Sequence, residues 1–176
     1  TDSDVDFALT VTATSTEGDG GDTATTFGTI TVNVDADADA PTLNVADVAG
    51  LEDSAIALNI TAEVTDDSES ISGITITGVP EGAVLSAGTS SVVDGVTTWT
   101  LSEADLPGLT VTPPANSDAD FDLSVSVTST DGTSSSTTTD QMTVDVSGVA
   151  DAPTVTATDV TGAEDSAIAL NITSAF

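Results

Sequence analysis

The chain has 176 residues, among them 30 Asp and Glu but no Lys, Arg, His or Cys, and its formal charge at pH 7 is −30. This composition excludes disulfides, Cys or His zinc sites, Ser-His-Asp catalysis, lysine chemistry and the cationic contacts that nucleic acids require. No side chain of the chain can neutralise this charge, so we expect bound cations to do so.

The predicted elements are short strands, in which apolar residues alternate with Ser, Thr or Asp at period two. In chain order the clearest runs are 42–45, 55–60, 74–77, 96–101, 121–127 and 142–146. Clusters of Gly, Pro, Asp and Ser separate them, and a single helical turn is possible at 102–106. About seven strands in about 110 residues indicate an all-β fold, an antiparallel β-sandwich. Trp99 lies on an alternating strand and is expected in the core rather than on a ligand platform.

Internal repeats organise the chain. The tetrapeptide Asp-Ala-Pro-Thr at 39–42 recurs at 151–154, which is an offset of 112 residues. At the same offset, the block Glu-Asp-Ser-Ala-Ile-Ala-Leu-Asn-Ile-Thr at 52–61 recurs unchanged at 164–173. Ten identical residues in a row do not arise by chance, so the sequence predicts a tandem array.

A third partial copy lies at the front, where residues 4–11 parallel residues 118–125. We therefore expect residues 1–39 to be the C-terminal part of one repeat. Residues 40–151 are expected to form one complete β-sandwich repeat, and residues 152–176 the N-terminal part of the next. The two outer pieces together are shorter than one repeat, so the chain is expected to be a window on a longer polypeptide.

Carboxylates are expected to gather at both ends of the complete repeat. If the strands run up and down, three segments reach its C-terminal pole: those before the second and sixth strands, and the one after the last strand. They carry Glu52, Asp53, Asp118, Asp120 and Asp151. Clustered carboxylates repel one another unless a cation joins them, and Ca²⁺ takes six to eight oxygen ligands. The alternative for any single Asp is a turn in which it bonds its own backbone.

The opposite, N-terminal pole is expected to gather a second set of metal ligands. There the segment after the second strand meets the incoming linker, and the preceding repeat reaches the same junction. These parts supply Asp66, Asp67, Glu69, Asp37, Asp39, Asp4 and Asp6. Five other carboxylates have no such partners and are expected in solvated loops: Asp19, Asp22, Asp94, Asp105 and Asp131.

Four motifs together resemble a known family. They are Ala-Asp-Ala-Pro at 150–153, the block that begins at Glu52, Gly-Val-Pro-Glu-Gly-Ala at 78–83 and Asp-Ala-Asp-Phe at 118–121. They are similar to the cadherin-like tandem extender repeats of giant RTX adhesins, which type I systems of Gram-negative bacteria secrete. The resemblance implies immunoglobulin-like sandwiches joined end to end on the cell surface, with calcium stiffening each junction. It also implies Asp39 and Asp151 as junction ligands, joined by Glu52, Asp118 and Asp120 of the preceding domain.

The function expected from the sequence is that of an extracellular structural extender in a bacterial adhesin, with calcium ions and neighbouring repeats of the same chain as partners. An enzyme is not expected, because no carboxylate pair stands out as acid and base. Direct membrane insertion is not expected either, because no run of about 20 apolar residues occurs. Two alternatives stay open. One is a binding module whose Thr-rich faces contact carbohydrate, ice or protein, and the other is a matrix filament formed by lateral self-association through edge strands.

Overall fold

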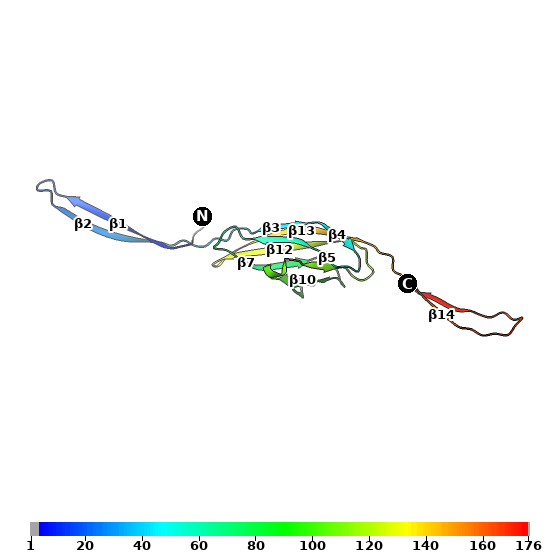
Figure 1. The fold of residues 1–176 in the computed structure, drawn as a ribbon. Coiled ribbons are helices and arrows are strands. Elements are labelled where there is room, and N and C mark those ends of the chain that lie inside the picture. The colour runs from blue at the N-terminus through cyan, green and yellow to red at the C-terminus, as the bar shows by residue number, and fades with distance from the viewer. Residues whose placement is uncertain (1–3, 176) are drawn as a thin grey trace.

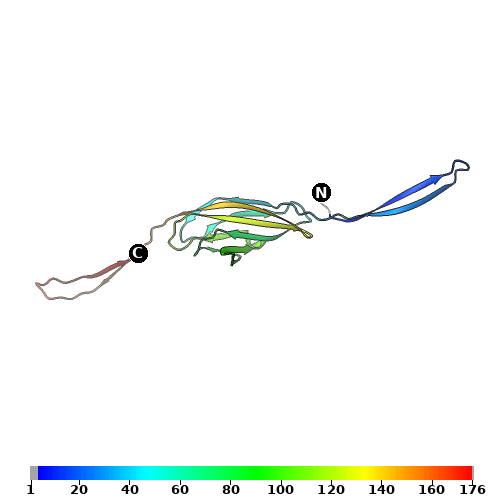
Figure 2. The same ribbon diagram turned by 180° about the vertical axis from the view of Figure 1, so that it is seen from behind.

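The computed structural model describes residues 4–175 and is all-β, with one short 3₁₀ turn, η1 (Glu103–Asp105), among these residues. Figure 1 shows a central sandwich from which one hairpin extends at each end, and Figure 2 shows the same arrangement from behind. The prediction of an all-β fold with antiparallel sheets is confirmed, and η1 lies within the turn expected at 102–106.

One layer of the sandwich is a six-stranded sheet. Its strands, in spatial order, are β4 (Val48–Leu51), β13 (Ser134–Ser147), β12 (Phe121–Asp131), β7 (Ser70–Thr77), β10 (Val96–Leu101) and β9 (Thr89–Val93). All neighbouring strands are antiparallel except β4 and β13, which run parallel. The Ser and Thr residues at 134–139 belong to the long strand β13. The alternation of apolar residues predicts this strand only from residue 142 onward.

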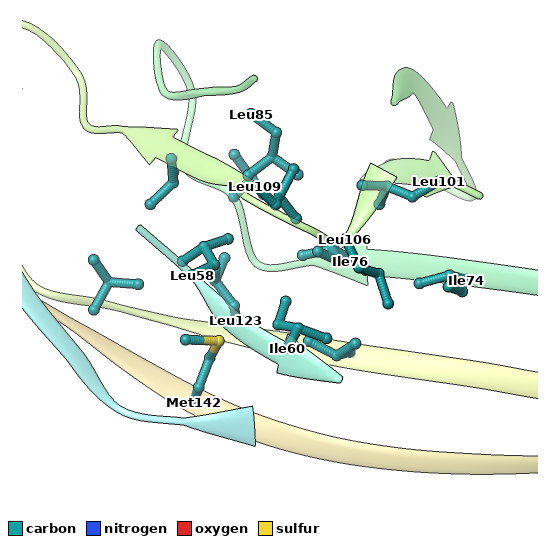
Figure 3. Packing of buried hydrophobic residues seen from close by; sticks show 14 of the residues in the cluster. Leu58, Ile60, Ile74, Ile76, Leu85, Leu101, Leu106, Leu109, Leu123 and Met142 are labelled. Carbon is teal, nitrogen blue, oxygen red and sulfur yellow. The ribbon is translucent and has the colours of Figure 1, made fainter. Parts of the chain in front are cut away.

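The facing layer consists of two smaller sheets. One contains β5 (Ile56–Ala57), β11 (Thr110–Thr112) and β8 (Val84–Leu85), and the other pairs β3 (Thr42–Ala46) with β6 (Asn59–Glu63). Side chains from both layers form one apolar cluster, part of which is drawn in Figure 3. Strand β12 shows why the pattern produces this core: Leu123, Val125 and Val127 are fully buried, while the residues between them face outward.

The N-terminal hairpin pairs β1 (Phe7–Thr16) with β2 (Thr23–Val32). Its register is that of the central hairpin, because Phe7 faces Val32 as Phe121 faces Val144. A hydrogen bond between an Asp side chain and the backbone at the open end of the hairpin also recurs. The Asp6 carboxylate accepts the N–H of Val34 at 2.9 Å, and the Asp120 carboxylate accepts that of Val146 at 2.8 Å. The two segments therefore have the same local structure.

The C-terminal hairpin pairs β14 (Thr154–Thr158) with β15 (Asn171–Ala175). It repeats the register of β3 and β6 at the offset of 112, with Thr154 opposite Ala175 as Thr42 is opposite Glu63. The turn conformation recurs too, since Asp53 and Asp165 both have a left-handed backbone, with φ of 55° and 61°. The repeated block thus keeps its turn conformation and strand register in a hairpin that packs on no second layer.

Candidate metal centre

Three carboxylates meet at the N-terminal pole of the sandwich. Asp39, Asp66 and Glu69 each offer one oxygen, and these oxygens lie within 4.8 Å of one another. Glu69 is buried, Asp66 half-buried and Asp39 exposed. Within residues 4–175, no other group of three Asp or Glu comes this close together. This part of the predicted convergence is therefore present in the structure.

Glu69 holds the linker against the sandwich. It lies immediately before β7, and its carboxylate accepts a hydrogen bond from the backbone N–H of Asp39. The other oxygen of Glu69 accepts hydrogen bonds from Thr65, at 3.0 Å from the hydroxyl and 3.4 Å from the backbone N–H. One side chain, only 8% exposed, thus joins the linker to the loop that follows β6.

Asp66 is held in its ionised form by the next turn of the chain. Its carboxylate accepts hydrogen bonds from the Ser68 hydroxyl at 2.5 Å and the Ser68 backbone N–H at 2.8 Å. These bonds favour the charged form, and they lower the pKa of Asp66 below its ordinary value of 3.8. The loop therefore presents a negative charge to Asp39 and Glu69.

Asp131 was expected in a solvated loop, and this expectation is wrong. It is the last residue of β12 and only 7% exposed, and it lies close enough to Asp4, Asp66 and Glu69 to feel their charges. Burial, and then repulsion by these three carboxylates, raises the pKa of Asp131. The sequence did contain a signal, because the inward parity of β12 continues through Ser129 to Asp131.

Hydroxyl groups of β12 and β13 also hold the linker against the following domain by hydrogen bonds. The Ser129 hydroxyl donates to the carbonyl oxygen of Asp39 at 2.6 Å, and the Thr138 hydroxyl donates to that of Pro41 at 2.8 Å. Ser134 reaches the Asp37 carboxylate at 3.4 Å. The position of the Asp39 carboxylate is therefore set by the β12–β13 hairpin rather than by the linker alone.

The other predicted ligands of this pole lie outside the three-carboxylate group. Asp4 is exposed but lies near Asp131, and Asp6 uses one oxygen to cap Val34. Asp37 lies on the linker, and Asp67 is exposed on the loop beside Asp66. These four side chains do not belong to the three-carboxylate group.

At the C-terminal pole the predicted residues approach one another less closely. Glu52 is 8% exposed and accepts the N–H of Val149 at 2.6 Å. A Cβ placed on Gly148 would lie 3.3 Å from an Asp118 carboxylate oxygen and 3.6 Å from a Glu52 one, so these two carboxylates flank the departing chain. Asp120 is engaged with Val146.

Two of the predicted C-terminal ligands have other positions. Asp53 adopts φ 55° and accepts the N–H of Asn116 at 3.0 Å, so its carboxylate is engaged in holding two loops together. Asp151 is exposed on the outgoing linker.

The chemistry of the N-terminal group suits a hard cation. Its ligand atoms are all oxygens, and the chain has no cationic side chain that could balance them. A buried carboxylate without a counter-charge is unfavourable, which a divalent ion would relieve. The group could therefore hold a metal ion, with three protein ligands.

No protein-family model matches the chain, and no curated protein matches it. None of the helical segments among residues 4–175 has the length and apolar character needed to cross a membrane.

Proposed function

We propose that this chain is a structural extender of a bacterial cell-surface adhesin, in which calcium stiffens the junction between successive sandwich repeats. The observation that carries the proposal is the joining of linker and domain at Glu69. One buried carboxylate accepts the linker N–H and also belongs to the three-carboxylate group. An ion bound there would fix the linker and the domain together. The extracellular location and the absence of enzyme activity are parts of the same proposal.

The two poles fit together as halves of one junction. Asp39 and Asp151 are equivalent in the repeat, so the linker entering the sandwich corresponds to the linker leaving it. Glu52 binds the leaving linker at Val149, and Glu69 binds the entering linker at Asp39, two residues further along the repeat. In an extended segment, N–H groups two residues apart point the same way. A complete junction would thus bring Glu52 of one domain and Glu69 of the next to one side of the linker.

The outer hairpins support the division into 1–39, 40–151 and 152–176. They reproduce the registers of β12–β13 and of β3–β6, yet their apolar side chains are exposed. Leu9 is about half exposed, whereas its counterpart Leu123 is fully buried. Such faces are expected of domain parts that further chain of the same repeat would cover.

The outer face of β12 and β13 bears on the alternative of a surface binder. Paired hydroxyls line it, with Ser126 and Thr139 2.7 Å apart and Thr128 and Thr137 2.9 Å apart. In the N-terminal hairpin the position of Thr139 is taken by Phe27, which is 76% exposed. A face that changes between repeats favours an extender over an array of identical binding surfaces.

Small-angle scattering tests the proposal on the chain as it exists. In millimolar calcium the profile is expected to be that of a rod whose maximum dimension is near the summed lengths of its parts. In chelator the distance distribution is expected to broaden and shorten, because unneutralised carboxylates repel one another across the junction. The Glu69→Gln variant should behave in calcium like the wild type in chelator, and Asp94→Asn should behave like the wild type. Identical profiles with and without calcium would contradict the proposal.

A further inference from the structure

One edge of the six-stranded sheet is open. Strand β9 is the last strand of this sheet and pairs with β10 alone, so its outer side faces no other strand among residues 4–175. The side chains of residues 89–92 are all exposed, and that of Val92 is 72% exposed. An edge strand presents a row of unpaired N–H and C=O groups to any strand that approaches it.

The turn that joins β9 to β10 determines which backbone groups point outward. The two turn residues, 94 and 95, have φ of 51° and 83°, as in the two-residue type I′ turn of β-hairpins. Val93 and Val96 flank this turn, so they exchange backbone hydrogen bonds, and along an antiparallel pair every second residue does the same. The N–H and C=O groups of Ser90 and Val92, between these positions, are therefore directed away from β10.

Strand β9 lacks the features that protect edge strands from pairing. Its sequence is Thr-Ser-Ser-Val-Val, with no charged side chain and no Pro, and its register with β10 contains no bulge. Natural edge strands usually carry at least one of these features. The opposite edge is protected, because β4 has only four residues and lies directly between Asp47 and Glu52. In a chain with a charge of −30, β9 is thus the edge that a second copy approaches against less repulsion.

The outer side of β9 is complementary to itself. A two-fold axis beside Ser91 places Ser90 of one copy opposite Val92 of the other, and the same pair forms again on the other side of the axis. Both pairs then exchange N–H···O bonds through the groups that point away from β10. Asp94 lies three residues from the axis in each copy, so the two carboxylates are about 20 Å apart along the strands. This separation exceeds the Debye length of about 10 Å at 0.1 M salt, so their repulsion is largely screened.

We propose that β9 is a self-association site, at which a second copy of the chain pairs antiparallel with β9 and continues the sheet across both molecules. The partner is a second copy because this edge offers backbone groups and small uncharged side chains, which another β9 complements in full. A cationic partner, which the acidic surface would attract, finds no carboxylate on this strand. The inference assigns one strand to the lateral association left open above, and it depends neither on the metal centre nor on the extender proposal.

Sedimentation equilibrium in chelator tests the inference without a contribution from bound metal. We expect a monomer at micromolar concentration and a dimer near millimolar concentration. The dimer fraction should rise between about 0.02 and 0.5 M NaCl, because salt screens the repulsion between the acidic surfaces. Where half of the chain is dimeric, amide hydrogen exchange at Ser90 and Val92 should slow by about twofold, while that at Ser91, whose N–H faces β10, should not change. A chain that stays monomeric at millimolar concentration in high salt would overturn the inference.

Two pairs of variants distinguish association at β9 from association through the exposed apolar faces of the outer hairpins. Val92→Pro removes an outward N–H without disturbing the pairing with β10, so it should weaken dimerisation by at least about tenfold, whereas Val92→Thr keeps the N–H and should dimerise like the wild type. Ser91→Glu places like charges opposite each other at the axis and should also prevent dimerisation. Ser135→Glu adds the same charge on β13, away from the edge, and should not. Should Val92→Pro not fold, Ser91→Glu decides. Dimerisation that survives in Ser91→Glu, or that Ser135→Glu weakens equally, would overturn the assignment.

Discussion

The carboxylate of Glu69 accepts a hydrogen bond from the backbone N–H of Asp39, thirty positions earlier in the chain. The same two residues contribute oxygens to the three-carboxylate group, so the position of the linker and the charge of the group are coupled. Any change that neutralises the group is expected to act on the linker as well.

Removal of calcium is expected to destabilise the chain. A ligand at one hundred times its Kd stabilises the folded state by about 2.7 kcal/mol, which moves the Tm of a domain of this size by on the order of 10 °C. Thermal unfolding followed by circular dichroism in calcium and in chelator checks this. Superimposable unfolding curves would show that no ion contributes to the fold.

Glu69→Gln is expected to weaken calcium affinity by at least about tenfold, a loss of about 1.4 kcal/mol, because it removes the buried charge of the group. Isothermal titration calorimetry measures the effect. Asp94→Asn is the control, because Asp94 lies in an exposed turn with φ 51°, and its affinity should equal that of the wild type. Equal losses in both variants would indicate diffuse screening instead of a coordinated ion.

Asp131→Asn is expected to have opposite effects in the two conditions. Without calcium the Asp131 charge is unfavourable, since burial and neighbouring carboxylates raise its pKa, so its removal should stabilise the fold. With calcium the same charge attracts the ion, so its removal should weaken binding. Denaturant unfolding in chelator and in calcium checks both signs, and a variant that destabilises in both conditions would contradict the account.

The pH dependence follows from the same shift. A carboxyl whose pKa is raised in the folded state destabilises it once ionised, so in chelator stability should rise as the pH falls from neutral through the raised pKa of Asp131. Asp66 has the opposite shift, and its contribution should be lost as the pH falls below 3.8 through its lowered pKa. In Asp131→Asn the first rise should be smaller, while the loss at low pH remains.

Gly78→Ala is expected to destabilise the sandwich by about 1–3 kcal/mol, because the new Cβ meets the Asp122 carbonyl and the backbone is left-handed. Gly73→Ala is the matched control on the same sheet, since nothing lies within 4 Å of its Cβ position. Urea unfolding should place Gly73→Ala within about 1 kcal/mol of the wild type. If Gly78→Ala did not change the free energy of unfolding, the loop between β7 and β8 would be able to move away from Asp122.

Much of the fold could be predicted from the sequence because strand pairing follows period-two burial. The runs around Leu123 and Met142 became β12 and β13, and the convergence of Asp66 and Glu69 on Asp39 followed from the ends of the strands. The short strands β8 and β11 could not be placed in the same way. Two or three residues next to Gly or Pro carry too little periodicity to stand out from a loop.

The candidate site was harder to predict, because side-chain direction within loops depends on hydrogen bonds that no periodicity encodes. Asp53 accepts a hydrogen bond from Asn116 and lies outside the three-carboxylate group, whereas Asp66 belongs to the group and also accepts hydrogen bonds from Ser68. The prediction for Asp131 was wrong for another reason. It assigned this carboxylate to the turn, whereas Asp131 is the last residue of strand β12. Ser129 and Asp131 are polar, but the alternation along β12 places them on the same inward face as Leu123, Val125 and Val127.

The parallel pair β4–β13 determines how the sandwich answers tension along its long axis. The chain enters through Pro41 and β3, which leads directly into β4, and it leaves at Ser147, the last residue of β13. Pulling the two linkers apart drags β13 along β4 in the direction of the strands. The pairs from Val48–Val144 to Leu51–Ser147, and the hydrogen bond from Glu52 N–H to the Ser147 carbonyl, are then loaded together in shear rather than opened one after another. The parallel pairing of β4 with the end of β13 thus gives the domain a mechanical clamp at the place where tension on its two linkers would act.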